Sequence, residues 1–115
     1  MRVLHERDGR RVVLATVVTL ADTPARQARG LTFRRSIPDD FAMVFRYPAV
    51  GVRGVHTVFV PFPIDVVWTI DDTVQRVETL RPWLGYARQE ADAFYEFPAG
   101  TCEAVEPGDR LVLEE

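Results

Sequence analysis

The sequence contains no lysine and no asparagine, and it has only one serine, Ser36, and one cysteine, Cys102. A single cysteine excludes an internal disulfide bond. No Gly-x-Ser-x-Gly elbow surrounds Ser36, so nothing in the sequence marks it as an activated nucleophile. Cys102 is interpreted as a small apolar residue of the core rather than as a nucleophile, because a lone cysteine most often has that role.

Metal-binding and phosphate-binding motifs are also missing. The only histidines are His5 and His56, and the sequence has no Cys-x-x-Cys, His-x-His or His-Glu-x-x-His arrangement. Zinc sites need three or four well-spaced ligands, so we expect no metal. Gly51 and Gly54 lack the lysine and the strand-to-helix context of a phosphate loop, so we expect no nucleotide cofactor.

The chain has no long hydrophobic run. Its longest, Val12–Ala21, covers about ten residues, whereas a membrane helix needs about twenty. The first eight residues become charged too early to form a signal peptide. We therefore expect a cytoplasmic protein with no membrane partner.

The composition indicates one globular domain, because 115 residues with 47% hydrophobic and 27% charged content can bury a core without disulfides. Arginine provides all 14 basic side chains, and the formal net charge is −3. Charge is uneven: residues 24–56 carry six arginines against Asp39 and Asp40, whereas residues 57–115 are strongly acidic. Because the acidic part dominates, we expect no nucleic acid partner.

Short apolar segments separated by Gly, Pro and Asp are typical of β-structure. Asp8-Gly9 predicts a hairpin between Val3–His5 and Arg11–Leu20, and Asp71-Asp72 predicts a turn that leads into Thr73–Leu80. The second segment is apolar on both faces, which predicts a strand inside the sheet.

One short helix is predicted over Pro24–Arg29, with Thr23 as its N-cap and Gly30 at its end. The other predicted strands are Phe41–Tyr47, Val55–Val60, Ile64–Ile70, Thr73–Leu80, Ala93–Phe97 and Arg110–Glu114. Thr73–Leu80 also has apolar residues at helical spacing, and its threonine and valine content favours a strand, with or without a bulge. Residues 48–54 and 81–91 are predicted as loops, and 98–105 as a loop or one helical turn. About eight short strands and one or two short helices predict an all-β fold, either a small barrel or a sandwich.

His56 and Asp65 are the main candidates for chemistry. If Val55–Val60 and Ile64–Ile70 pair as a hairpin, Thr57 comes close to Asp65, and His56 lies one step away. A His–Asp pair suits acid–base catalysis near neutral pH. The simpler interpretation is a hydrogen-bonded histidine at the end of a strand.

Arginines near the predicted helix are candidates for binding an anion, because the planar guanidinium matches carboxylate and phosphate. Solvated or ion-paired arginines are the simpler interpretation. Trp83 and Tyr86 beside Gly85 either line a groove for a sugar or pack over the end of a barrel. The predicted ligand-binding residues are Arg29, Arg34, His56, Thr57 and Asp65.

Several segments, taken in order, resemble the motifs of a known family. They are Gly30-Leu31-Thr32-Phe33-Arg34-Arg35 with Ile37-Pro38, Ala42-Met43-Val44-Phe45, Pro63-Ile64-Asp65-Val66-Val67-Trp68, and Tyr95-Glu96-Phe97-Pro98-Ala99-Gly100 with Gly108-Asp109. Together they resemble the domain of unknown function 192 family, over about Val12 to Val112.

The resemblance implies a compact β-barrel or sandwich with a short helix, and it implies no established activity. Family members usually have Trp-Met-Lys-Asn-Thr before their Pro-Leu-Asp motif, where this chain has Gly54-Val55-His56-Thr57-Val58. The Lys-Asn pair is therefore missing, so a site built on that pair is either absent from this chain or uses His56 for part of its role. Many relatives carry a secretion signal, which we do not expect here.

Three functions follow as hypotheses. The first is a non-enzymatic binding module for a small polar or anionic ligand, such as a carbohydrate. The second is a hydrolase or lyase that uses His56 and Asp65. The third is a protein-interaction module whose basic middle faces an acidic partner, or the acidic part of another copy. We expect a monomer or a weak homodimer.

Overall fold

The computed structural model describes all residues from Met1 to Glu115. Strands make up most of the chain, and the only α-helix has six residues. The elements are β1 (Arg2–Arg7), β2 (Arg10–Ala15), β3 (Val17–Leu20), α1 (Pro24–Arg29), β4 (Phe41–His56), β5 (Ile64–Ile70), β6 (Thr73–Leu80), β7 (Tyr86–Pro98) and β8 (Arg110–Glu114). No helix is long or apolar enough to cross a membrane.

The eight strands form one sheet in the order β2-β1-β8-β6-β5-β7-β4-β3. The pairs are antiparallel except β3 with β4, which is parallel. The sheet does not close, because β2 and β3 remain as its edges. The predicted all-β class is confirmed, and a barrel-like or sandwich fold fits this curled sheet.

Two tight turns follow directly from the sequence. Asp8 and Gly9 connect β1 to β2 with φ values of 50° and 78°, and Asp71 and Asp72 connect β5 to β6 with φ values of 47° and 65°. Two consecutive residues with positive φ form the turn whose twist matches antiparallel strands. Asp and Gly adopt this conformation at low cost, so both predicted turns are confirmed.

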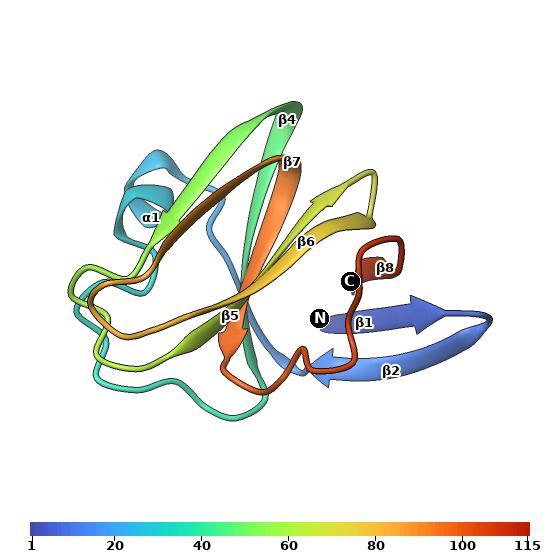
Figure 1. Ribbon diagram of the computed structural model, residues 1–115, viewed down its shortest axis with the longest axis horizontal. Helices are drawn as coiled ribbons and strands as arrows, with labels where there is room; N and C mark the ends of the chain where they lie inside the picture. The colour runs from blue at the N-terminus through green and yellow to red at the C-terminus, as the bar shows by residue number, and fades with distance from the viewer.

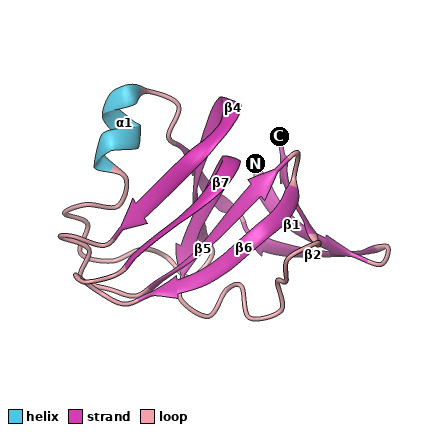
Figure 2. Cartoon of the chain, turned by 45° about the horizontal axis from the view of Figure 1, so that its top comes forward, coloured by secondary structure: helices cyan, strands magenta, loops and turns pink.

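Helix α1 also forms where its caps predict it. The Thr23 hydroxyl accepts a hydrogen bond from the Arg26 amide at 3.2 Å, and Pro24 occupies the first turn. The Gly30 amide donates to the Arg26 carbonyl at 2.9 Å, which ends the helix. In Figures 1 and 2, α1 lies at one end of the molecule, and the β1–β2 hairpin lies at the opposite end.

The central strands bury both of their faces, which produces two cores. Alternate residues of β5 face opposite sides: Ile64, Val66 and Trp68 enter the first core, and Val67 enters the second. The first core is Ala21, Leu31, Phe41, Met43, Phe45, Val55, Val60, Ile64, Val66, Trp68, Leu80, Ala87, Ala91 and Phe94. The second core is Val3, Ala15, Ala42, Val44, Val67, Val74, Tyr95, Phe97, Cys102, Val105 and Leu111.

The predicted hairpin between Val55–Val60 and Ile64–Ile70 is wrong. Strand β4 ends at His56, and β5 pairs with β6 and β7 rather than with β4. The predicted loop over 48–54 is wrong as well, because β4 continues through it and pairs with β7 on both sides of an irregularity between Arg46 and Gly51. This bulge absorbs the residues that looked like strand breakers.

Two further predictions need correction. The segment Arg11–Leu20 is not one internal strand: it divides at Thr16 into β2 and β3, which form the two edges of the sheet. The predicted loop over 81–91 is too long, because β7 begins at Tyr86. Strand β3 and the first half of β7 both pair with β4, which lies far away in the sequence, so local patterns do not reveal these strands.

Candidate functional site

The largest concave feature is an open groove of about 1030 Å³ between β3, α1 and the loop after α1. We call it the arginine groove, because four arginines line it. Its lining residues are Met1, Val18, Thr19, Leu20, Ala21, Asp22, Arg26, Arg29, Gly30, Arg34, Arg35, Ser36 and Met43. Two of the sequence-predicted site residues, Arg29 and Arg34, therefore lie in one groove.

The local sequence explains why these arginines gather. Arg26 and Arg29 are three residues apart in α1, which puts them on neighbouring positions of one helix face. Gly30 has a φ of 50° and turns the chain out of the helix, so the loop brings Arg34 and Arg35 back beside the same groove.

The charges of the groove are largely unpaired within the protein. None of its four arginines forms an ion pair; Arg26 makes one long hydrogen bond, at 3.5 Å, to the Leu20 carbonyl. The Arg34 guanidinium lies 5.3 Å from the centre of the Phe41 ring. The only carboxylate in the lining, Asp22, already accepts a hydrogen bond from Arg46 at 3.2 Å.

A second, much smaller cavity of about 60 Å³ lies under α1, between the helix and strands β4 and β7. Arg29 and His56 both line it, together with Glu96 and apolar residues of the first core, and we call it the Glu96 pocket. It is far smaller than the arginine groove.

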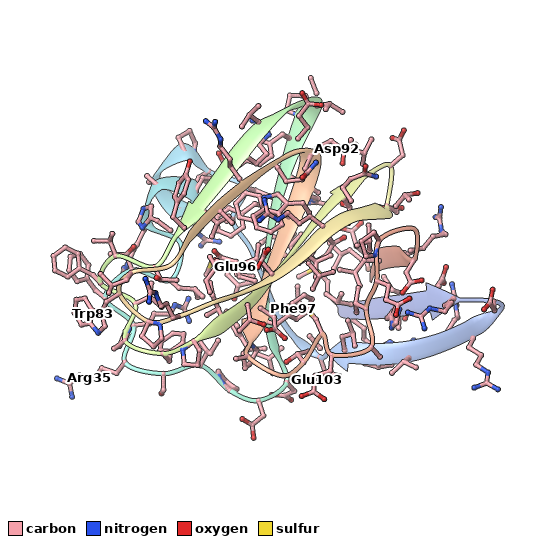
Figure 3. The ribbon with its side chains drawn as sticks, in the orientation of Figure 1. Arg35, Trp83, Asp92, Glu96, Phe97 and Glu103 are labelled. Atoms are coloured by element: carbon pink, nitrogen blue, oxygen red, sulfur yellow. The ribbon has the colours of Figure 1, made fainter.

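Glu96 is the most unusual ionisable group that lines either cavity, and Figure 3 shows it near the middle of the molecule. It is buried, and its Oε1 atom has no hydrogen-bond partner. Burial alone raises the pKa of its carboxyl group to about 8. In the sequence, Glu96 stood only inside one motif of the family resemblance, and no local signal indicated that it would be buried without a partner.

The structure does not bring His56 and Asp65 together. His56 is exposed at the end of β4, where its Nδ1 atom accepts a hydrogen bond from the Val58 amide at 3.2 Å. Asp65 is buried on the second-core side of β5. Its carboxylate accepts hydrogen bonds from the Thr79 hydroxyl at 2.7 Å and from the amides of Gly100 and Cys102 at 3.0 and 2.9 Å.

Thr57 also serves the fold. It is fully buried, and its hydroxyl donates to the Arg81 carbonyl at 2.7 Å while accepting from the Gly85 amide at 2.7 Å. Trp83 and Tyr86 are exposed, and neither lines the arginine groove or the Glu96 pocket. The predicted rim of His56, Thr57 and Asp65 is therefore not formed.

Other candidate chemistry is structural. Cys102 is buried, which raises the pKa of its thiol and keeps it protonated. No group of three or more His, Cys, Asp or Glu side chains is placed to hold a metal ion. Asp109 accepts hydrogen bonds from His5 at 2.8 Å and from Arg7 at 2.7 and 2.8 Å, and the Arg7 hydrogen bond is the main cause that lowers the Asp109 pKa.

Comparison with solved structures identifies two similar chains. A protein from Sinorhizobium meliloti 1021, described as a "putative transcription regulator", is 26% identical with a TM-score of 0.84, over 96% of this chain and 91% of that one. A protein of unknown function from Novosphingobium aromaticivorans DSM 12444 is 22% identical, also with a TM-score of 0.84, over 97% of this chain and 84% of that one.

Comparison with curated proteins found no match. A family model does match: DUF192, described as "Uncharacterized ACR", covers residues 3–113. The matched region is slightly longer than the one that the sequence motifs indicated.

Proposed function

Because this chain belongs to the DUF192 family, which is uncharacterised, its function rests on its own residues, and we propose that the arginine groove binds a small anionic ligand. The ligand would present carboxylate or phosphate oxygens to Arg26, Arg29, Arg34 and Arg35. The protein would then act as a binding module rather than as an enzyme.

One observation carries this proposal: four arginines surround one groove and none of them has an acidic partner in the chain. Guanidinium groups recognise carboxylate and phosphate through paired hydrogen bonds, and these bonds are stronger than those between neutral groups. A groove of about 1030 Å³ is also large enough for a metabolite-sized ligand.

The charge of the groove narrows the ligand class. A neutral sugar would cover the arginines without neutralising them, whereas a sugar acid, a sugar phosphate or a polycarboxylate supplies the missing negative charge. Among carbohydrates, we therefore favour those that carry an anionic group.

The hydrolase or lyase hypothesis has less support. Acid–base partners must reach one substrate proton, and His56 and Asp65 lie in different environments on opposite sides of the sheet. Glu96 shares a pocket with His56, but that pocket of about 60 Å³ is far smaller than the roughly 300–1,000 Å³ of typical ligand sites. The groove is the better place for a ligand.

The test is to titrate the protein with citrate, and separately with inorganic phosphate, and to measure each affinity by isothermal titration calorimetry. Arg29→Gln and Arg35→Gln should each weaken citrate binding about tenfold, because each removes a charge-assisted hydrogen bond. Arg10→Gln is the matched control, since Arg10 lies at the β1–β2 hairpin. Citrate affinity that is equal in all four proteins would contradict the proposal.

A further inference from the structure

Three exposed aromatic residues project from three different loops at the same end of the molecule. They are Phe33, Phe59 and Trp83, which are 67%, 48% and 50% exposed, and we call them the aromatic tips. The ring centres of Phe33 and Phe59 are 5.0 Å apart, and those of Phe59 and Trp83 are 5.7 Å apart. The three side chains thus form one continuous apolar surface.

The backbone at each tip is held in a conformation that bulky residues rarely adopt. The φ angles of Phe33, Phe59 and Trp83 are 67°, 60° and 66°. Such a conformation disfavours any side chain with a Cβ atom, and it is most unusual for an aromatic residue outside the core. In each of the three loops, the residue in this strained conformation is aromatic, and its ring is exposed to solvent.

Hydrogen bonds between the loops keep the tips in place. The Phe33 amide donates to the Phe59 carbonyl at 3.0 Å, and the Trp83 amide donates to the Val60 carbonyl at 3.1 Å. The Thr57 amide donates to the Gly85 carbonyl at 3.0 Å. The aromatic surface is therefore displayed by a cross-linked set of loops rather than by loose segments.

Every charged residue in the three loops that carry the tips is basic. Loops 31–36, 57–62 and 81–86 contain Arg34, Arg35 and Arg81 and no acidic residue, although the whole chain has a net charge of −3. Figure 3 shows Arg35 and Trp83 extending from the same end of the molecule. A partner of this surface must tolerate apolar insertion and also supply negative charge.

From these observations we infer that the aromatic tips dock peripherally on an anionic phospholipid surface. Aromatic side chains favour the interfacial region of a bilayer, and arginines beside them are attracted to anionic headgroups. The expectation of no membrane partner rested on the lack of a spanning segment, which does not bear on a peripheral contact.

Two other possible partners of the aromatic tips, a sugar and a second copy of the chain, fit less well. Phe59 and Trp83 meet at 70°, so the rings offer no flat platform on which a sugar could stack. A symmetric dimer through this surface would bring the arginines of both copies together without any carboxylate to offset them. The aromatic rings line neither the arginine groove nor the Glu96 pocket, so the apolar contact lies outside the proposed ligand site, whereas Arg34 and Arg35 belong to both surfaces.

The sequence supplies its own reporter for a test. Only two tryptophans are present; Trp68 is fully buried and donates its indole N–H to the Arg53 carbonyl at 2.9 Å, whereas Trp83 is a tip. We expect tryptophan emission to shift to shorter wavelength, and the protein to co-sediment, with vesicles of phosphatidylglycerol in phosphatidylcholine. Vesicles of phosphatidylcholine alone should give a much smaller effect, and added salt should weaken binding.

The informative variant is Phe33→Asn with Phe59→Asn, because asparagine tolerates positive φ and Trp83 remains as the reporter. Vesicle binding should fall at least about tenfold, since two inserted apolar side chains are lost. Val12→Thr is the matched control: Val12 is 54% exposed on β2, at the opposite end of the molecule, and its variant should bind as the unmodified protein does.

The inference is overturned if phosphatidylglycerol vesicles leave the Trp83 emission and sedimentation unchanged, or if the double variant binds them as well as the unmodified protein. Citrate titration of the same proteins separates the two proposals. The double variant should keep its citrate affinity. If the unmodified protein binds vesicles but not citrate, only the proposal for the arginine groove is contradicted. Loss of both in the double variant would also count against a separate docking surface.

Discussion

The side-chain oxygen of Thr57 lies 2.7 Å from the backbone nitrogen of Gly85 and accepts its hydrogen bond. This contact joins the loop after β4 to the loop before β7, and the same hydroxyl donates to the Arg81 carbonyl. Because Thr57 is fully buried, its position explains why the residue cannot serve a ligand directly. It instead supports the loops that carry Phe59 and Trp83.

Replacing Thr57 with valine should destabilise the protein by about 2–3 kcal/mol, because a buried amide and a buried carbonyl lose their partner. Urea unfolding followed by circular dichroism measures this. Thr57→Ser keeps the hydroxyl, so it should lower the free energy of unfolding clearly less than Thr57→Val does. If the valine and serine variants were equally stable, the hydrogen bonds would have no net role.

Gly85 should not tolerate a side chain. A Cβ atom there would lie 2.7 Å from the Leu80 Cβ atom and 2.9 Å from the Arg81 carbonyl oxygen, which is closer than real contacts allow. Gly85→Ala should therefore lower the free energy of unfolding by about 2–4 kcal/mol. Gly51→Ala is the control, since its nearest neighbour is the flexible end of the Arg53 side chain, and it should cost less than about 1 kcal/mol.

Glu96 should make stability fall as the pH rises. Its pKa is about 8 in the folded protein and near 4.5 in the unfolded chain, so between these values only the folded state holds the proton. The unfolded state is then favoured by about 1.4 kcal/mol for each pH unit. Below pH 4.5 both states are protonated and the effect disappears.

The matching variant is Glu96→Gln, which keeps the shape but does not titrate. It should be more stable than the unmodified protein at pH 8, and the difference should shrink as the pH falls towards 4.5. Chemical denaturation at a series of pH values measures both curves. Parallel curves across this range would mean that Glu96 is ionised in the folded protein.

Asp65 should behave as a structural residue. Asp65→Asn leaves one acceptor oxygen for the three donors Thr79, Gly100 and Cys102, and it should cost about 2–3 kcal/mol of stability. His56→Ala should change stability by less than about 0.5 kcal/mol, because His56 is exposed. Thermal and urea unfolding of both variants would show whether their effects differ in this way.

Asp109 should contribute more to the stability of the folded protein at neutral pH than in acid. Its folded-state pKa is lowered, so its contribution is present above its ordinary pKa and is lost as the pH falls below it. Asp109→Asn should lower the midpoint of thermal unfolding by roughly 5–10 °C at pH 7. The gap should narrow when both proteins are unfolded in acid; a constant gap would argue against the charged interaction with Arg7.

Features set by neighbouring residues were predictable from the sequence. The caps of α1 and the turns at Asp8-Gly9 and Asp71-Asp72 are local, and the structure has them where expected. The partner of β4 was not predictable in this way: residues 86–91 of β7 lie thirty or more positions away from the residues they pair with, and a bulge in β4 made part of the strand look like a loop.

The residues of the candidate site divide in the same way, into those placed by the local sequence and those that depend on distant pairing. Arg29 and Arg34 are close in the sequence and line one groove, whereas Asp65 and His56 depended on a strand pairing that does not form. The burial of Glu96 without a partner depends on α1 closing over β4 and β7. The positive φ angles of Phe33, Phe59 and Trp83 have no local sequence signature, because Gly and Asn are the usual residues there.

Strand β1 lies beside β8, so Arg2 pairs with Glu114 across almost the whole length of the chain. Strand β1 is synthesised long before β8, so this pairing can form only after the residues between them have been made. Until β8 has been made, the β1–β2 hairpin lacks its other neighbour in the sheet. A chain that stops before residue 110 would keep that edge of β1 open to other molecules.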